Sequence, residues 1–160
     1  MIDDLVDVFY RPLVQPLGNL VILFAQAEAS LLDLVAALKD VDEWQAQAVL
    51  KMKNPKEQVL ALVRASSGFE GFDLSELLDG VEGFWADKER RNRYIHDEWF
   101  PLLDEEGTPA IRGLPHKKGS DVTWDAPTAA DIWALARGFQ VREHLFSHAA
   151  FRIRKQRLVR

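Results

Sequence analysis

Helix start signals recur along this chain and constrain its fold more than any other feature. Each signal is a capping residue followed three positions later by an acid, a spacing at which both side chains reach the free backbone N–H groups of a helix N-terminus. The pairs are Asp40 with Glu43, Asn54 with Glu57, Asp73 with Glu76, and Thr128 with Asp131. The sequence therefore predicts an all-α fold, a bundle of four to five helices.

A further helix is expected before these signals. An apolar series at helical spacing adds a long first helix from about Leu17 to Lys39. The later helices are expected over about 40–52, 54–65, 73–99 and 128–155. A chain of 160 residues fits one domain, which we place at 1–160.

The segment around 101–127 interrupts the helical pattern. Prolines and glycines exclude a helix there: Pro101, Gly107, Pro109, Gly113, Pro115 and Gly119. Residues 111–114 and 121–124 are compatible with a short β-hairpin that has His116, Lys117 and Lys118 at its tip. We expect a hairpin or an irregular insertion, and a connection of this length is often functional.

Composition bears on the compartment. The chain has no cysteine, which excludes disulfides and thiolate metal sites and fits a reducing cytoplasm. The start at Met1 is acidic, whereas a secretory signal begins with basic residues. No apolar run looks long enough to cross a bilayer. We therefore expect a cytoplasmic protein without membrane contact.

Charge is distributed unevenly along the chain. Residues 137–160 carry seven bases and one acid, a net charge of +6, whereas residues 1–50 carry two bases and eight acids, a net charge of -6. The acidic front and the basic tail can attract each other in a dimer, or the tail can meet phosphates. A solvated helix end explains the basic tail equally well.

The helix expected over 73–99 carries the polar residues that chemistry would need. Asn92 and His96 are four positions apart and share one face, which is otherwise lined by tryptophans. Arg91 lies about 140° around the helix from His96, but its long side chain lets both converge on a ligand lying along the helix. Three interpretations stay open: pairing with acids such as Glu28, an ordinary solvated face, and a catalytic site.

The stretch Arg91-Asn92-Arg93-Tyr94-Ile95-His96 resembles the signature of the HEPN superfamily, which is an arginine, a polar residue, three more positions and a histidine. In that family the motif lies near the end of a long helix, before an aromatic residue and a loop, as it would here. The loose motif also fits Arg90 with His96, Arg137 with His144, and Arg142 with His148. We favour Arg91 because Asn92 supplies the expected polar residue.

The resemblance implies a bundle of four or five helices and a metal-independent endoribonuclease, as in a toxin or a defence protein. His96 as a neutral imidazole would accept the proton of an RNA 2′-hydroxyl. Arg91 would bind the phosphate, and Asn92 would orient the phosphate or the histidine ring. Because one histidine cannot perform both proton transfers at once, the resemblance also implies a homodimer with two motifs across a two-fold axis.

The resemblance also implies RNA and possibly an antitoxin protein as partners. Lys88, His116, Lys117 and Lys118 are candidate RNA contacts, although a basic loop tip is more often only solvated. Some family members carry a modifiable tyrosine two residues after the histidine, and this chain has Glu98 there.

We expect no cofactor and no metal. His144 and His148 are four apart, a spacing that binds metals, but no convincing third ligand accompanies them.

Two other functions remain as alternatives. One is a non-catalytic HEPN-like helical module that binds a partner protein or RNA. The other is an unrelated helical interaction module in which Arg91 and His96 are buried in ion pairs.

Overall fold

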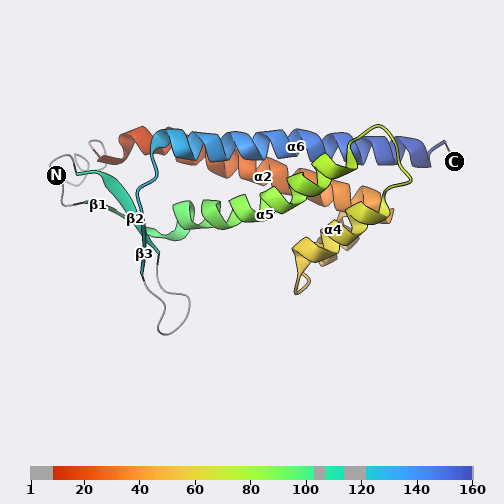
Figure 1. Cartoon of the computed structure of the whole chain (residues 1–160), viewed down its shortest axis with the longest axis horizontal. Helices are drawn as coiled ribbons and strands as arrows, with labels where there is room; N and C mark the ends of the chain where they lie inside the picture. The colour runs from red at the N-terminus through yellow and green to blue at the C-terminus, as the bar shows by residue number, and fades with distance from the viewer. Residues whose placement is uncertain (1–8, 103–106, 114–121, 160) are drawn as a thin grey trace.

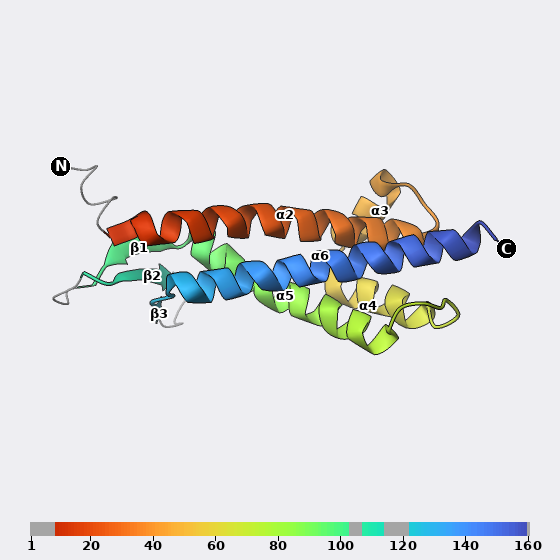
Figure 2. The same ribbon diagram turned by 90° about the horizontal axis from the view of Figure 1, so that it is seen from above.

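Two long helices lie side by side along the length of the molecule (Figures 1 and 2). They are α2 (Arg11–Lys39) and α6 (Ala129–Arg157), and they run in the same direction in the computed structural model. The structure describes residues 9–102, 107–113 and 122–159. Asp33 and Arg154 join the two helices, with Arg154 Nη1 donating to Asp33 Oδ2 at 2.9 Å. These two helices form the main framework of the fold.

The third long helix, α5 (Leu74–His96), runs back beneath this pair (Figure 1). Its Phe84 lies in the core, where it stacks on Phe24 of α2 with ring centroids 5.8 Å apart. Phe139 of α6 meets both rings edge-on, at centroid distances of 5.2 and 5.8 Å. Phe146, also on α6, packs edge-on against Phe84. This aromatic cluster holds the three long helices together at their centre.

Two short helices, α3 (Glu43–Leu50) and α4 (Pro55–Ala65), cover one end of the bundle. At the other end is a small antiparallel sheet in the order β1 (Glu98–Pro101), β2 (Pro109–Gly113) and β3 (Thr123–Asp125). Ile111, at the centre of the sheet, is fully buried and is paired with Trp99 on one side and Asp125 on the other. The sheet therefore closes the bundle where α5 ends.

The predicted helical character is confirmed, with five helices in the described part of the chain. Helix α2 begins at Arg11, earlier than expected, and includes Pro16. Pro12 lies in the first turn, where a backbone N–H has no partner within the helix. Pro16 follows one turn later, so the hydrogen bond that its missing N–H would make is lost near the start of α2.

The start predicted for the second helix is wrong. Asp40 ends α2 in the left-handed conformation, with φ at 57°, and Asp42 caps α3 by accepting a hydrogen bond from the Gln45 N–H at 2.8 Å. Both Asp40 and Asp42 have a suitable residue three positions later, so the local sequence alone does not decide between them.

The predicted helix to Trp99 is also wrong at its end. Helix α5 stops at His96, and Trp99 lies in β1, where its indole Nε1 donates to the Tyr94 carbonyl at 2.9 Å. The predicted hairpin corresponds to the pair β2–β3, while β1 was not expected. Its proposed tip, His116 to Lys118, lies outside the described residues.

Helix α2 corrects the expectation about apolar runs. It has a mean hydropathy of 1.8 over an 18-residue window and is long enough to cross a bilayer by length and composition. In the structure 44% of that window is buried inside the protein. A core helix of a globular protein passes the same test.

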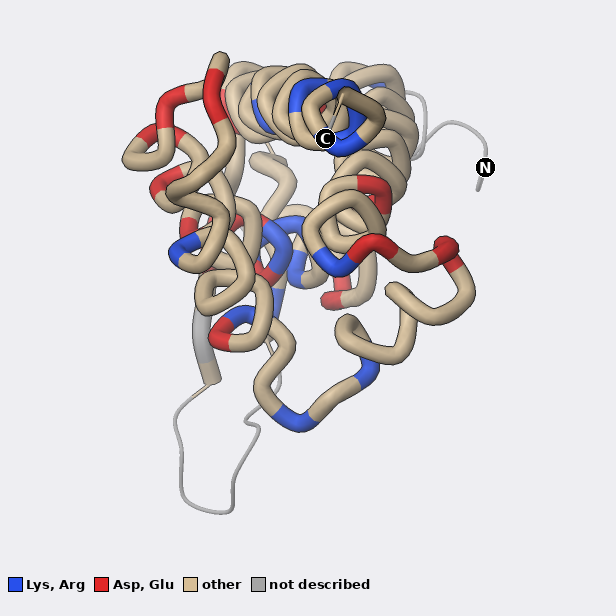
Figure 3. The backbone as a smooth tube through the Cα atoms, turned by 90° about the vertical axis from the view of Figure 1, so that its right-hand side faces the viewer, with Lys and Arg blue, Asp and Glu red and all other residues tan. Residues whose placement is uncertain are grey.

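The basic tail gathers at the end of α6 near the C-terminus (Figure 3). Two of its arginines are paired with acids of the front. Arg154 binds Asp33, and Arg157 Nη1 lies 2.9 Å from Asp40 Oδ2. Part of the attraction expected between the acidic front and the basic tail therefore acts within one chain.

Candidate functional site

Arg91 lies between α5 and α2. Its guanidinium carbon lies 4.5 Å from the centroid of the Phe24 ring, a distance typical of a cation–π contact. Its Nη1 donates to Asn92 Oδ1 at 3.0 Å, which fixes the side chain from a second direction. Its Nε is buried and has no hydrogen-bond partner among the described atoms. Arg91 is therefore held in place by its contacts with Phe24 and Asn92.

Lys88 lies one turn before Arg91 and shares the same aromatic ring. Its ammonium nitrogen is 5.5 Å from the Phe24 centroid and 2.8 Å from Glu28 Oε1. Glu28 was a candidate partner for Arg91 or His96, and the structure pairs it with Lys88 instead. Lys88, a predicted RNA contact, is thus partly neutralised.

His96 is the last residue of α5 and is exposed. Its imidazole makes no hydrogen bond or ion pair with any residue in 9–102, 107–113 or 122–159. Arg91 faces α2 and His96 faces solvent, as their positions around the helix require. The structure therefore places both on one helix end and accessible, without bringing them into contact or sealing them in the core.

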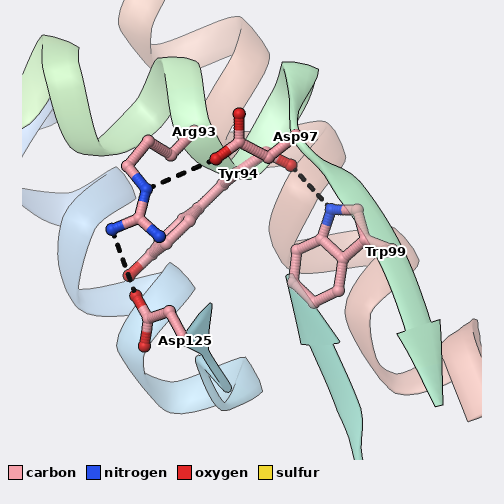
Figure 4. A network of polar contacts seen from close by, with 5 residues as sticks. All are labelled: Arg93, Tyr94, Asp97, Trp99 and Asp125. Carbon is pink, nitrogen blue, oxygen red and sulfur yellow. Dashed lines mark hydrogen bonds and ion pairs between the residues drawn. The ribbon is translucent and has the colours of Figure 1, made fainter. Parts of the chain in front are cut away.

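The turn after His96 is fastened by a polar network (Figure 4). Arg93 Nε lies 3.4 Å from Asp97 Oδ2, and Arg93 Nη1 lies 4.0 Å from Asp125 Oδ2 on β3. Tyr94 is buried beside this network, and burial, with the Asp125 carboxylate adding to it, raises the pKa of its phenol. Together with the bond from Trp99 to the Tyr94 carbonyl, these contacts fix the end of α5 against the sheet.

Sequence reasoning missed Arg93 and Asp125 as residues that position this site. The spacing of Arg93 and Asp97, four residues apart on a helix, is a signal for their ion pair. Asp125 comes from a strand far along the chain, so no local pattern indicates it.

The competing motif of Arg142 and His148 has a structural role. Arg142 Nη1 binds Asp87 Oδ2 at 2.6 Å between α6 and α5, and His148 Nε2 lies 3.0 Å from the Gly71 carbonyl oxygen. His144 is exposed and its Nδ1 lies 2.7 Å from Glu143 Oε2. These rings have separate partners, so the spacing of His144 and His148 does not create a shared site.

His116, Lys117 and Lys118, which were predicted to contact RNA, lie outside the described residues. Within the described part of the chain, no cluster of three or more histidine, aspartate or glutamate side chains is arranged to hold a metal ion.

Comparison of the chain with models of known protein families, with curated proteins and with solved structures finds no match.

Proposed function

We propose that this protein is a metal-independent endoribonuclease of the HEPN type. The observation that carries the proposal is the Arg91 guanidinium, which is half-exposed, is fixed by Phe24 and Asn92, and lies on the same helix end as the exposed His96. A fixed guanidinium can stabilise the negative charge that develops on a phosphate, and a solvent-open imidazole can accept a proton near neutral pH.

The reaction needs only these groups and the RNA. His96 takes the proton of the 2′-hydroxyl, and the resulting oxygen attacks the adjacent phosphorus. The bond from phosphorus to the 5′-oxygen of the next nucleotide breaks, leaving a cyclic phosphate and a 5′-hydroxyl. That leaving oxygen needs a proton, which His96 of a second copy supplies. Arg91 binds the phosphate throughout, and Asn92 holds Arg91.

The proposal extends to the compartment, the oligomeric state and the biological role of the enzyme. It acts in the cytoplasm as a homodimer and serves as a toxin or a defence protein, with an antitoxin as a possible partner. Support for the dimer comes from the geometry of α5, where Arg91 and His96 face different directions, so that one chain alone offers an incomplete site.

RNA cleavage in the presence of a chelator tests this function. The wild-type protein is expected to cleave a mixed RNA, and His96→Ala to lose the activity. His144→Ala is the matched control, because His144 is also exposed, is 74% accessible and has its own partner in Glu143. Equal cleavage by the wild type and His96→Ala, or none by the wild type on a broad set of RNAs, contradicts the proposal.

A second candidate is a non-catalytic HEPN-like helical module that binds a partner protein or RNA. Two observations favour it. His96 has no described contact that would orient its ring, and α2 carries exposed apolar residues, Val14, Val21 and Ile22. RNA binding without cleavage in the same assay supports this second function.

A further inference from the structure

A pocket of about 390 Å³ lies where α2, α3 and α5 meet. This volume is within the range of small-ligand sites. Its wall combines an aromatic surface from Trp85 and Phe84 with the polar groups of Glu28, Gln47, Lys51 and Lys88. Such a mixture suits a flat ring that also carries hydrogen-bonding and anionic groups.

Trp85 is the flat surface of this pocket. It is only partly buried, and Phe84 meets it edge-on with ring centroids 5.3 Å apart and an interplanar angle of 74°. Phe84 is itself locked in the core, so the indole is held by a rigid neighbour. A half-exposed, immobilised indole is a good platform for stacking a nucleobase, since every base has a flat face.

The charges of the pocket favour an anion. Two bases, Lys51 and Lys88, stand against one acid, Glu28, so the lining has a net charge of +1. Glu28 is used by Lys88, whereas Lys51 Nζ binds only the neutral Gln47 Oε1 at 3.1 Å. Lys51 is therefore available to a phosphate, and Glu28 and Gln47 can bind the edge of a base.

Lys88 links the pocket to the Arg91 site. Lys88 lines the pocket, and both Lys88 and Arg91 lie over the same Phe24 ring. Trp85, Asn92 and His96 are spaced by seven and four residues, which places them on one face of α5. The helical rise separates Trp85 from His96 by about 16 Å, a length that a short single strand can span.

The surface on the far side of Trp85 limits where a bound RNA strand can lie. A second hollow there is lined by Lys53 and Lys56 but also by Glu57, Glu82 and Glu89, a net charge of -1. A phosphate backbone is not attracted to this hollow.

We propose that the Trp85 pocket binds one base of a single-stranded RNA whose reacting phosphate lies a few nucleotides away, at Arg91 and His96. This inference rests on the proposed ribonuclease function and specifies its substrate as unpaired RNA. A paired base cannot enter, because its edge and its faces are already occupied within the duplex.

Binding of a short fluorescently labelled oligoadenylate to variants in a His96→Ala background tests the pocket without requiring cleavage. Trp85→Ala is expected to weaken binding about 5- to 150-fold, as is typical for loss of a base–aromatic stack. Lys51→Ala should also weaken it, and Trp85→Phe should retain most of the affinity. The matched controls are Trp44→Ala, an exposed tryptophan outside the pocket, and Lys53→Ala, which lines the opposite hollow; both should bind as the parent does.

Lys51→Ala removes only an exposed side chain, so its effect does not depend on how well Trp85→Ala folds. Oligoadenylates with one abasic position provide a further measurement. At the position that occupies the pocket, removing the base should weaken binding of the parent but not of Trp85→Ala.

The outcomes separate the two proposals. If the Trp85 and Lys51 variants bind like their controls, or if no variant binds the oligonucleotide, the pocket inference is overturned, even when the wild type cleaves RNA. If these variants bind more weakly but the wild type cleaves no RNA, the pocket stands and the nuclease proposal fails.

Discussion

Arg90 and Arg91 are neighbours in the chain but have different surroundings. Arg90 is exposed, whereas Arg91 is partly buried, contacts Phe24 and binds Asn92. Both satisfy the loose spacing to His96, so the motif alone does not choose between them. The contacts favour Arg91, because a guanidinium that acts in catalysis must be held still.

This difference leads to a prediction for RNA cleavage. Arg91→Ala should lower the turnover rate by about 10²- to 10³-fold, the usual cost of removing one donor to a developing negative charge. Arg90→Ala is the control and should retain the wild-type rate. Arg91→Lys should also be impaired because an ammonium group lacks the planar fork of a guanidinium. If Arg90→Ala lost RNA cleavage and Arg91→Ala cleaved like the wild type, Arg90 would be the phosphate-binding residue instead.

Part of this residue-level arrangement is predictable from the sequence. Helical spacing alone sets Arg91 about 140° away from His96. It does not reveal that Phe24 lies beneath Arg91, or that Glu28 binds Lys88, because these contacts join segments that are far apart in the chain. The partner of each polar group depends on how the helices pack.

Among the helices, the start of α6 is the most completely capped. Thr128 Oγ1 accepts a hydrogen bond from the Asp131 N–H at 3.1 Å, and Asp131 Oδ2 accepts one from the Thr128 N–H at 2.8 Å. The start of α4 differs, because the side chain of its capping residue, Asn54, makes no such bond. The same sequence pattern is thus accompanied by different capping hydrogen bonds at α4 and α6.

Thr128→Ala should lower the free energy of unfolding by about 1 kcal/mol, as expected for loss of a bonded cap. Asn54→Ala should cost clearly less. Chemical denaturation of both variants and the wild type measures the difference. An equal loss in the two variants would mean that the bonds at Thr128 do not stabilise α6.

Part of the Thr128 effect should depend on pH. The hydrogen bonds from the Thr128 backbone and hydroxyl lower the pKa of Asp131. A lowered carboxyl pKa stabilises the fold above the ordinary aspartate value of about 4, and the stabilisation disappears as the pH falls through the lower folded-state pKa. The gap between wild type and Thr128→Ala should therefore be constant near neutral pH and narrow only in strong acid.

The helix starts at Asn54, Asp73 and Thr128 were predictable because their signals are local. Strand β1 was not, since it exists only by pairing with β2 across a connection of several residues. Trp99 continues the helical stripe in sequence, yet its backbone is extended. The helical spacing of residues in the local sequence does not show that a strand from elsewhere in the chain will pair with this segment.

At the scale of the whole molecule, one chain offers Arg91 and His96 on different sides of α5. The proposed mechanism uses His96 of both chains, so a dimer of one wild-type and one His96→Ala chain should be inactive. With equal amounts of the two chains, a quarter of the dimers keep both histidines, so cleavage should fall to about a quarter of that of the same amount of wild-type protein.

A mixture of wild-type and Arg90→Ala chains is the control and should cleave like the wild type alone. RNA cleavage by the purified mixtures, prepared by co-expression, gives the measurement. A mixture of wild-type and His96→Ala chains that keeps half of the wild-type cleavage would show that one His96 is sufficient for a site.

The pairing of α2 with α6 joins segments made at very different times during translation. Many of the contacts that cover α2, such as Asp33 with Arg154 and the Leu38 carbonyl with Arg157, form only with α6. Until α6 leaves the ribosome, the growing chain presents a partly uncovered apolar helix, a state that favours aggregation and recruits chaperones. Phe24, which fixes Arg91, belongs to that same helix. Because Phe24 also packs against Phe139 of α6, the proposed Arg91 site is complete only after α6 has been made.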